Sequence, residues 1–248
     1  MADRQNSRGA GELRPVRLTR RYLRYAHGSC LFELGDTRVL CAANVSEGVA
    51  MWRKGGGMGW LTAEYSLLPA STHTRTRREA TSGGLRGRTH EIQRMIGRSL
   101  RAVVDMGGFG GEYTVNVDCD VLQADGGTRT AAVTGACLAV HDALVTWRDA
   151  GKMSEIPLID FVGATSVGMV DGEVLLDLDY GEDSNAEIDM NVVMDGRGRF
   201  IEVQGTGERT PFDRSVLDNM LDLATEGIGR LVELQRRVVA EDADVFEL

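Results

Sequence analysis

The chain has 248 residues, 42% of them apolar, which is enough to bury one large core or two smaller ones. Its formal net charge of −9 argues against a surface that coats nucleic acid throughout, yet it permits a local basic channel. The four cysteines and four histidines show no paired metal-ligand spacing, which argues against a zinc site, and no segment reads as a secretory leader or membrane span. We expect a cytoplasmic protein with reduced thiols and no membrane partner.

The first part of the chain reads as strands after a loosely held polar segment of fifteen residues. Alternating or β-branched runs predict strands at Val16–Arg20, Ser29–Leu34 and Arg38–Val45. Gly35-Asp36 predicts a hairpin turn between the last two. After a loop over residues 46–59, another strand is expected at Trp60–Leu67, and residues 69–89 read as an extended, mobile connection.

The clearest helix is predicted over Glu91–Met106, because its apolar residues fall on one face and its arginines on the opposite face. A strand at Tyr113–Asp120 and a second helix over residues 130–150 follow. We take residues 12–150 as a first α/β half of one domain that spans residues 1–248.

The second half, over residues 151–240, begins with two hairpins. Their turns are predicted at Asp171-Gly172 and at Asp195–Gly198, and one or two amphipathic helices follow over residues 212–240. In each of the two halves, the predicted strands therefore come before the predicted helices. This order indicates an α/β fold of the α+β type, built from a duplicated unit of a mixed sheet with helices on one face.

The segment Gly126-Gly127-Thr128-Arg129 has the composition of an anion-binding turn. Glycines let backbone N–H groups approach a ligand, Thr128 adds a hydroxyl and Arg129 a guanidinium suited to phosphate. The positive end of the following helix would point to the same place. An ordinary strand-to-helix turn with a capping threonine remains an alternative.

The segment Asp177–Asp189 places six carboxylates in thirteen residues without a basic residue. Such crowding requires a cation or solvent, which indicates a site for a hard divalent ion. Asp183 and Asp189 would lie about 20 Å apart on a straight strand, at roughly 3.3 Å per residue. To bind one ion they need a turn near Ser184-Asn185. The alternative is a solvated acidic hairpin loop.

A third segment, residues 72–88, is rich in arginine in an otherwise acidic chain. Arginines in this stretch of small polar residues predict a path of positive potential for a polyanion, and they are Arg75, Arg77, Arg78, Arg86 and Arg88. A solvated loop without a role is the alternative.

Several long motifs, in this order along the chain, resemble those of the ribonuclease PH family. They are Leu13-Arg-Pro15, Gly59-Trp-Leu-Thr-Ala-Glu-Tyr65, Gly87-Arg-Thr-His-Glu-Ile-Gln-Arg94, Leu122-Gln-Ala-Asp-Gly-Gly-Thr-Arg-Thr-Ala131, Glu182-Asp-Ser-Asn-Ala-Glu-Ile-Asp-Met-Asn191 and Ile201-Glu-Val-Gln-Gly-Thr206. The resemblance covers nearly the whole chain, from residue 12 to about residue 240.

This resemblance implies a phosphate-dependent 3′→5′ exoribonuclease with the duplicated α/β fold of the family, of the ribosomal protein S5 domain 2-like type. Members of this family trim the 3′ ends of tRNA precursors and release nucleoside 5′-diphosphates. They also catalyse the reverse reaction, which adds nucleotides. Inorganic phosphate would be the co-substrate and Mg²⁺, or Mn²⁺, the cofactor. The assembly implied is a homohexamer made of three dimers.

The resemblance also implies roles for individual residues. Asp183 and Asp189 would bind the metal ion or act on the reacting phosphate. The attacking phosphate would be held by Arg88, Gly127, Thr128 and Arg129. We expect Arg75, Arg77 and Arg78 to bind the RNA.

Two rival functions follow from the same residues. A catalytically inactive RNA-binding ring subunit of the same fold should lack the arginine or the aspartates, whereas this chain retains them. A Mg²⁺-dependent nucleotide kinase or phosphatase should carry a nucleotide-binding loop, and the G-K-[ST] and G-x-G-x-x-G patterns are absent here.

Overall fold

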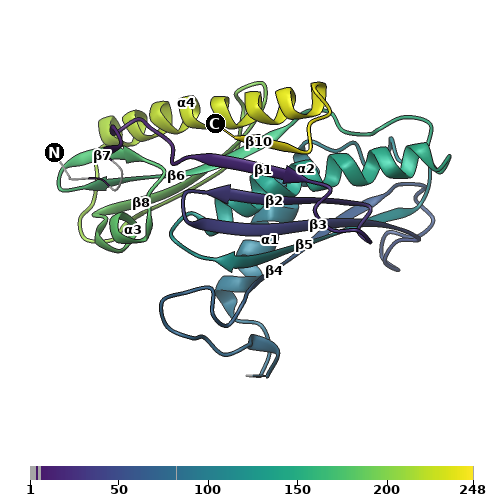
Figure 1. Ribbon diagram of the computed structural model, residues 1–248, viewed down its shortest axis with the longest axis horizontal. Helices are drawn as coiled ribbons and strands as arrows, with labels where there is room; N and C mark the ends of the chain where they lie inside the picture. Colours follow the sequence, from purple (N-terminus) through teal and green to yellow (C-terminus); the bar gives the residue numbers. More distant parts are fainter. Residues whose placement is uncertain (1–3, 5–6, 82, 248) are drawn as a thin grey trace.

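The computed structural model describes residue 4, residues 7–81 and residues 83–247. These residues form two β-sheets and four α-helices, with a shared core where the sheets meet (Figure 1). The predicted class, an α/β fold of the α+β type with paired sheet-and-helix units, is confirmed.

The first sheet is mixed and contains six strands in the order β10-β1-β2-β3-β5-β4. Only the β4–β5 pair among these neighbours is parallel. One face is apolar and buried, for example at Phe32, Val117 and Leu61, whereas Asp118 and Asp120 point to the opposite face because side chains alternate along β5. The strand bounds are Val16–Arg20 (β1), Gly28–Leu34 (β2), Thr37–Glu47 (β3), Trp60–Leu67 (β4), Tyr113–Gln123 (β5) and Val245–Glu247 (β10).

Two helices, α1 (Gly87–Ala102) and α2 (Thr128–Asp149), cover the apolar face of the first sheet. Helix α2 also packs against the second sheet through β6, and most of its residues are buried. By length and composition α2 could cross a membrane, yet 78% of its most apolar 18-residue window is buried inside the protein. Its apolar character is therefore explained by its central place in the core.

The second sheet has the order β7-β6-β8-β9 and is antiparallel throughout, rather than mixed as expected. Its strands are β6 (Val162–Val170), β7 (Glu173–Leu176), β8 (Ile188–Asp195) and β9 (Phe200–Gly207). Tight turns join β6 to β7 and β8 to β9, which requires the antiparallel arrangement. Helix α4 (Arg214–Ala240) lies along this sheet and packs on Met190 and Val192. The opposite face carries Asp189 and Asn191.

Two sequence expectations, on the first long helix and on the N-terminal segment, were wrong in detail, and one strand was not predicted. The first long helix begins at Gly87 and ends at Ala102, so Arg88 lies in its first turn instead of in the preceding loop. The C-terminal residues Val245–Glu247 add an edge strand beside β1. The described residues of the N-terminal segment are held firmly, since Arg4, Arg8 and Arg14 are at least nine-tenths buried.

Candidate active-site cleft

The residues predicted to bind phosphate and metal line a single cleft of about 1200 Å³. It lies between the starts of α1 and α2, the short helix α3 (Tyr180–Asn185) and the polar face of β8 and β9. The six residues brought together are Arg88, Gly127, Thr128, Arg129, Asp183 and Asp189.

The turn before α2 depends on its two glycines. Gly126 has φ 75° and Gly127 has φ 64°, in the left-handed region that favours glycine. A Cβ atom at Gly126 would also lie 2.5 Å from the carbonyl oxygen of Leu178. The turn therefore packs directly against the chain that leads into α3, and Thr37 fixes it by donating a 2.6 Å hydrogen bond to the Gly126 carbonyl.

The N-terminus of α2 is open to a ligand. Its N-cap is Gly127, and no side chain of the described residues caps it. The expected alternative of a capping threonine is thus wrong: the Thr128 hydroxyl lies 2.8 Å from the hydroxyl of Tyr65. Helix α2 has 22 residues, so its first backbone N–H groups present partial positive charge to the cleft. This is the arrangement that binds phosphate in many proteins.

Two arginines add full positive charge beside this helix end. Arg129 is mostly buried; its guanidinium lies 3.5 Å from Gln204 Oε1 and 3.8 Å from Glu91 Oε1. Arg88 is exposed in the cleft, and its side chain forms no hydrogen bond or ion pair with any residue in the described part of the chain. Both guanidiniums are therefore available to an anion.

Five of the six carboxylates of the acidic segment form two sets, and the sixth, Glu187, accepts a hydrogen bond from the backbone N–H of Gly172. The first set consists of Asp177, Asp179 and Glu182, which are buried and paired with arginines of the N-terminal segment. Arg4 Nε lies 2.7 Å from Glu182 Oε1, and Arg14 Nη2 lies 2.7 Å from Asp177 Oδ1. The arginines of the chain itself therefore supply the positive charge that these crowded carboxylates require.

The second set, Asp183 and Asp189, faces the cleft. Helix α3 is fixed by a capping box between Asp179 and Glu182, which orients Asp183, and β8 carries Asp189. Ser184 and Asn185 are the last residues of α3, so the chain between Asp183 and Asp189 is not the straight strand that the metal hypothesis excludes. Burial, together with the charge of Asp183, raises the pKa of Asp189 to about 6. Although Asp183 is exposed at the cleft, partial desolvation also raises its pKa, and Arg129 and Arg88 oppose this rise.

This carboxylate pair fits a hard divalent cation. Asp189 Oδ1 is buried without a hydrogen-bond partner among the described residues, so it has the lone pairs that a cation would need. No group of three or more His, Cys, Asp or Glu side chains in the described ranges is placed to hold a metal ion. Mg²⁺ is commonly bound through one or two carboxylates, with water and substrate phosphates completing its coordination. Asp183 and Asp189 match that requirement.

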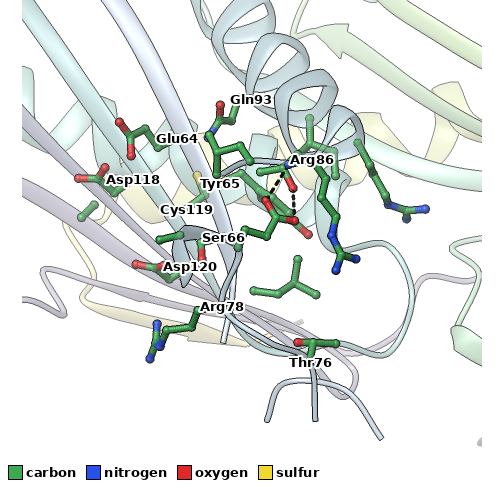
Figure 2. Close-up of a pocket in the computed structure, with 18 of the residues that line it drawn as sticks. Glu64, Tyr65, Ser66, Thr76, Arg78, Arg86, Gln93, Asp118, Cys119 and Asp120 are labelled. Carbon is green, nitrogen blue, oxygen red and sulfur yellow. Dashed lines mark hydrogen bonds between the residues drawn. The ribbon is translucent and has the colours of Figure 1, made fainter. Parts of the chain in front are cut away.

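The arginines predicted to bind RNA lie on the exposed loop before α1, outside the turn at residues 126–129. Arg77 and Arg78 line a second cavity, of about 900 Å³, on the polar face of β4 and β5. Figure 2 shows Arg78 near Asp120, and the charge of Arg78 opposes the rise in the pKa of Asp120 that burial causes. Arg75 is exposed on the same loop. Arg88 lines both cavities, so it marks their junction.

Sequence analysis missed several residues of the cleft. The rings of His73 and Tyr180 lie 5.3 Å apart at the cleft, and Asn191 and Gln204 also line it. Asn191 could have been found from its position two residues after Asp189 on the same strand face. The others come from separate elements, and no local pattern connects them.

Comparison with known proteins identifies the family. The two domain models of the 3′ exoribonuclease family match residues 12–146 (domain 1) and residues 160–227 (domain 2). Ribonuclease PH of Moorella thermoacetica is 58% identical over 240 residues, which cover 97% of this chain and 96% of that protein.

Solved structures share the fold at low identity. An Archaeoglobus fulgidus exosome with RNA bound to the active site has a TM-score of 0.79 at 22% identity, covering 94% of this chain and 92% of the other. Rice (Oryza sativa) Rrp46 has a TM-score of 0.75 at 22% identity, covering 94% and 98%. With both family domains matched and 58% identity to a ribonuclease PH over almost its full length, the chain belongs to the ribonuclease PH family of 3′ exoribonucleases.

Proposed function

We propose that the chain shortens RNA from its 3′ end by phosphorolysis, with tRNA precursors as substrates. One observation carries this proposal: a single cleft joins an open helix N-terminus and two arginines to the carboxylates of Asp183 and Asp189. The helix N-terminus and the arginines suit an attacking phosphate. The carboxylates suit a metal ion at the scissile phosphodiester. An inactive ring subunit would need neither, so the enzyme is favoured over that alternative.

In the proposed reaction, an oxygen of inorganic phosphate bonds to the phosphorus of the terminal phosphodiester. The bond from that phosphorus to the 3′ oxygen of the preceding nucleotide breaks. The products are a nucleoside 5′-diphosphate and an RNA one nucleotide shorter with a free 3′ hydroxyl; the reverse reaction adds a nucleotide. Phosphate is already anionic at neutral pH, so no general base of high pKa is needed.

The main obstacle is repulsion between two anions. Two unit charges about 4 Å apart repel by about 4 kcal/mol at an effective dielectric of 20. The first N–H groups of α2, together with Arg129 and Arg88, would offset this repulsion and hold the phosphate in line. Asp183 and Asp189 would hold Mg²⁺, or Mn²⁺ in its place. The ion would polarise the scissile phosphate and stabilise charge on the leaving oxygen.

The assembly and location are part of the proposal. We propose a homohexamer built from three dimers, in line with the family resemblance and with the fold shared with an archaeal exosome core. Arg75, Arg77 and Arg78 would guide the body of the tRNA precursor towards the cleft. A cytoplasmic location is supported by four cysteines that are all buried and free.

A phosphate titration tests the proposal. Shortening of a 5′-labelled RNA is measured with Mg²⁺ at increasing phosphate concentration, with sulfate as the control anion. We expect the rate to rise with phosphate to saturation and to be negligible in sulfate. Equal shortening in both anions would show hydrolysis and contradict phosphorolysis.

A further inference from the structure

The N-terminal segment contacts two elements that form the cleft, the turn before α2 and the chain that leads into α3. Arg14, just before β1, contacts the phosphate-binding turn on one side and the chain leading into α3 on the other, although these parts lie 111 and 163 residues away in the sequence. Its side chain is only 4% exposed. Each of the three nitrogens of its guanidinium forms a hydrogen bond.

On the carboxylate side, Arg14 binds Asp177 through both oxygens. Nη2 lies 2.7 Å from Oδ1 and Nε lies 3.0 Å from Oδ2, and the backbone N–H of Arg14 donates to Oδ2 at 2.8 Å. Such a two-point pair fixes direction as well as distance. Asp177 has φ 55°, so the chain enters α3 through an unusual backbone conformation at this residue.

On the phosphate side, the same guanidinium binds the turn through its carbonyls. Nη1 donates to the Asp125 carbonyl and Nη2 lies 3.4 Å from the Gly126 carbonyl. A Cβ atom placed on Gly127 would lie 3.1 Å from Nη2. Arg14 therefore sits directly behind the turn, opposite the cleft, and holds the carbonyls so that the N–H groups of the turn and of α2 face the ligand.

We infer that Arg14 is a positioning residue that sets the distance between the phosphate-binding turn and the carboxylate pair. The inference rests on the proposed function and adds to it a residue that touches no substrate. In-line attack requires the nucleophile and the metal-bound phosphodiester to be placed relative to each other. The rigid guanidinium of Arg14 is hydrogen-bonded both to the turn before α2 and to the chain that leads into α3. It therefore fixes their relative position more directly than packing alone.

Arg4 and Arg8 extend the same support without reaching the turn. Arg4 pairs with Glu182 at 2.7 Å, and Arg8 lies 3.4 Å from the same carboxylate. They neutralise α3 on its buried side, and in the described part of the chain neither forms a hydrogen bond or ion pair with Asp125 or Gly126. Loss of Arg4 or Arg8 should loosen α3 alone. Loss of Arg14 should affect both α3 and the turn before α2.

The test compares Arg14→Lys with Arg17→Lys in the full chain. Lysine keeps the charge for Asp177, but a single ammonium cannot serve the carboxylate and both carbonyls. Arg17 lies three residues further along the chain in β1, is half-exposed and, among the described residues, pairs only with Glu33 and Glu247. Initial rates are measured against phosphate and, separately, against a short RNA, and far-UV circular dichroism gives the unfolding midpoint.

For Arg14→Lys we expect kcat/KM for phosphate to fall about 10²-fold, as for a misplacement of roughly 1 Å. The KM for RNA should change less than about twofold, since the RNA-binding arginines are untouched. Arg17→Lys should match the unmodified chain. Unchanged phosphate constants in a folded Arg14→Lys protein, with only a lower unfolding midpoint, would overturn the inference and leave Arg14 a purely structural residue.

A second variant covers the case in which Arg14→Lys does not fold. Asp177→Asn keeps the side-chain volume and the guanidinium but weakens the other end of the bridge, so it should give the same phosphate-specific loss. Normal phosphate constants in this variant would also overturn the inference. An unmodified chain whose activity does not depend on phosphate would instead overturn the proposed function, and the inference with it.

Discussion

Asp183 raises the pKa of Asp189, adding to the effect of burial, and the two carboxylates face the same cleft. A protein retains such an unfavourable pair where a cation relieves it. Asp189→Asn or Asp183→Asn should therefore lower kcat about 10²-fold or more in both directions of the reaction, because each removes a formal charge without a change in volume. Turnover of a short RNA, with circular dichroism to verify folding, is the measurement. Near-normal turnover would remove the residue from the chemistry.

Arg129→Ala and Arg88→Ala should act on phosphate rather than on RNA. Each would remove hydrogen bonds to a charged ligand, worth about 1.5–3 kcal/mol, so the phosphate KM should rise about 10- to 100-fold. Arg98→Ala is a matched control on α1, since Arg98 is exposed and paired with Glu202. Weakened RNA affinity at an unchanged phosphate KM would reassign these arginines to the RNA backbone.

Local patterns predicted much of this architecture. The strands Val16–Arg20 and Trp60–Leu67 have the predicted bounds, and both glycine turns of the second sheet form where expected, because turn chemistry and alternation act over a few residues. The common cleft for Asp183, Asp189 and Arg129 was predicted from the family resemblance. The pairing of Arg14 with Asp177 was not foreseen, because no local pattern links residues 163 positions apart.

The arginine loop should affect long substrates only. Replacing Arg75, Arg77 and Arg78 with alanine should weaken binding of a tRNA precursor, and each lost phosphate contact should reduce the salt slope by about 0.7–0.9. Arg214→Ala on α4 is the control, as Arg214 pairs with Asp218 on the surface. Degradation of a very short oligonucleotide should change little. Equal affinity and an equal salt slope in the triple variant would favour the solvated-loop alternative.

The buried pair of Arg20 and Asp142 should make stability depend on pH. Burial opposes ionisation, yet hydrogen bonds from His141 and Arg20 hold the pKa of Asp142 below its usual range. Since the folded pKa is depressed, the stabilisation is present above the unfolded pKa of about 3.9 and is lost as pH falls through the folded pKa. Asp142→Asn should cost about 3–5 kcal/mol at pH 7, because Arg20 loses its buried partner.

Urea unfolding at pH 7 and at pH 3 measures this effect. The difference between Asp142→Asn and the unmodified chain should shrink at the lower pH. Asp149→Asn, on the same helix in an exposed pair with Arg148, should cost under about 1 kcal/mol at both. An equal cost of Asp142→Asn at both pH values would show that packing, not charge, accounts for the stabilisation.

The most direct measurement follows the phosphate itself. Unlabelled RNA is incubated with the protein, Mg²⁺ and ³²P-labelled inorganic phosphate, and the nucleotide products are separated. If phosphate is the nucleophile held by Arg129 and the N-terminus of α2, the label appears at the β position of released nucleoside 5′-diphosphates. Nucleoside 5′-monophosphates, with all the label left in inorganic phosphate, would show that water is the nucleophile and contradict the account.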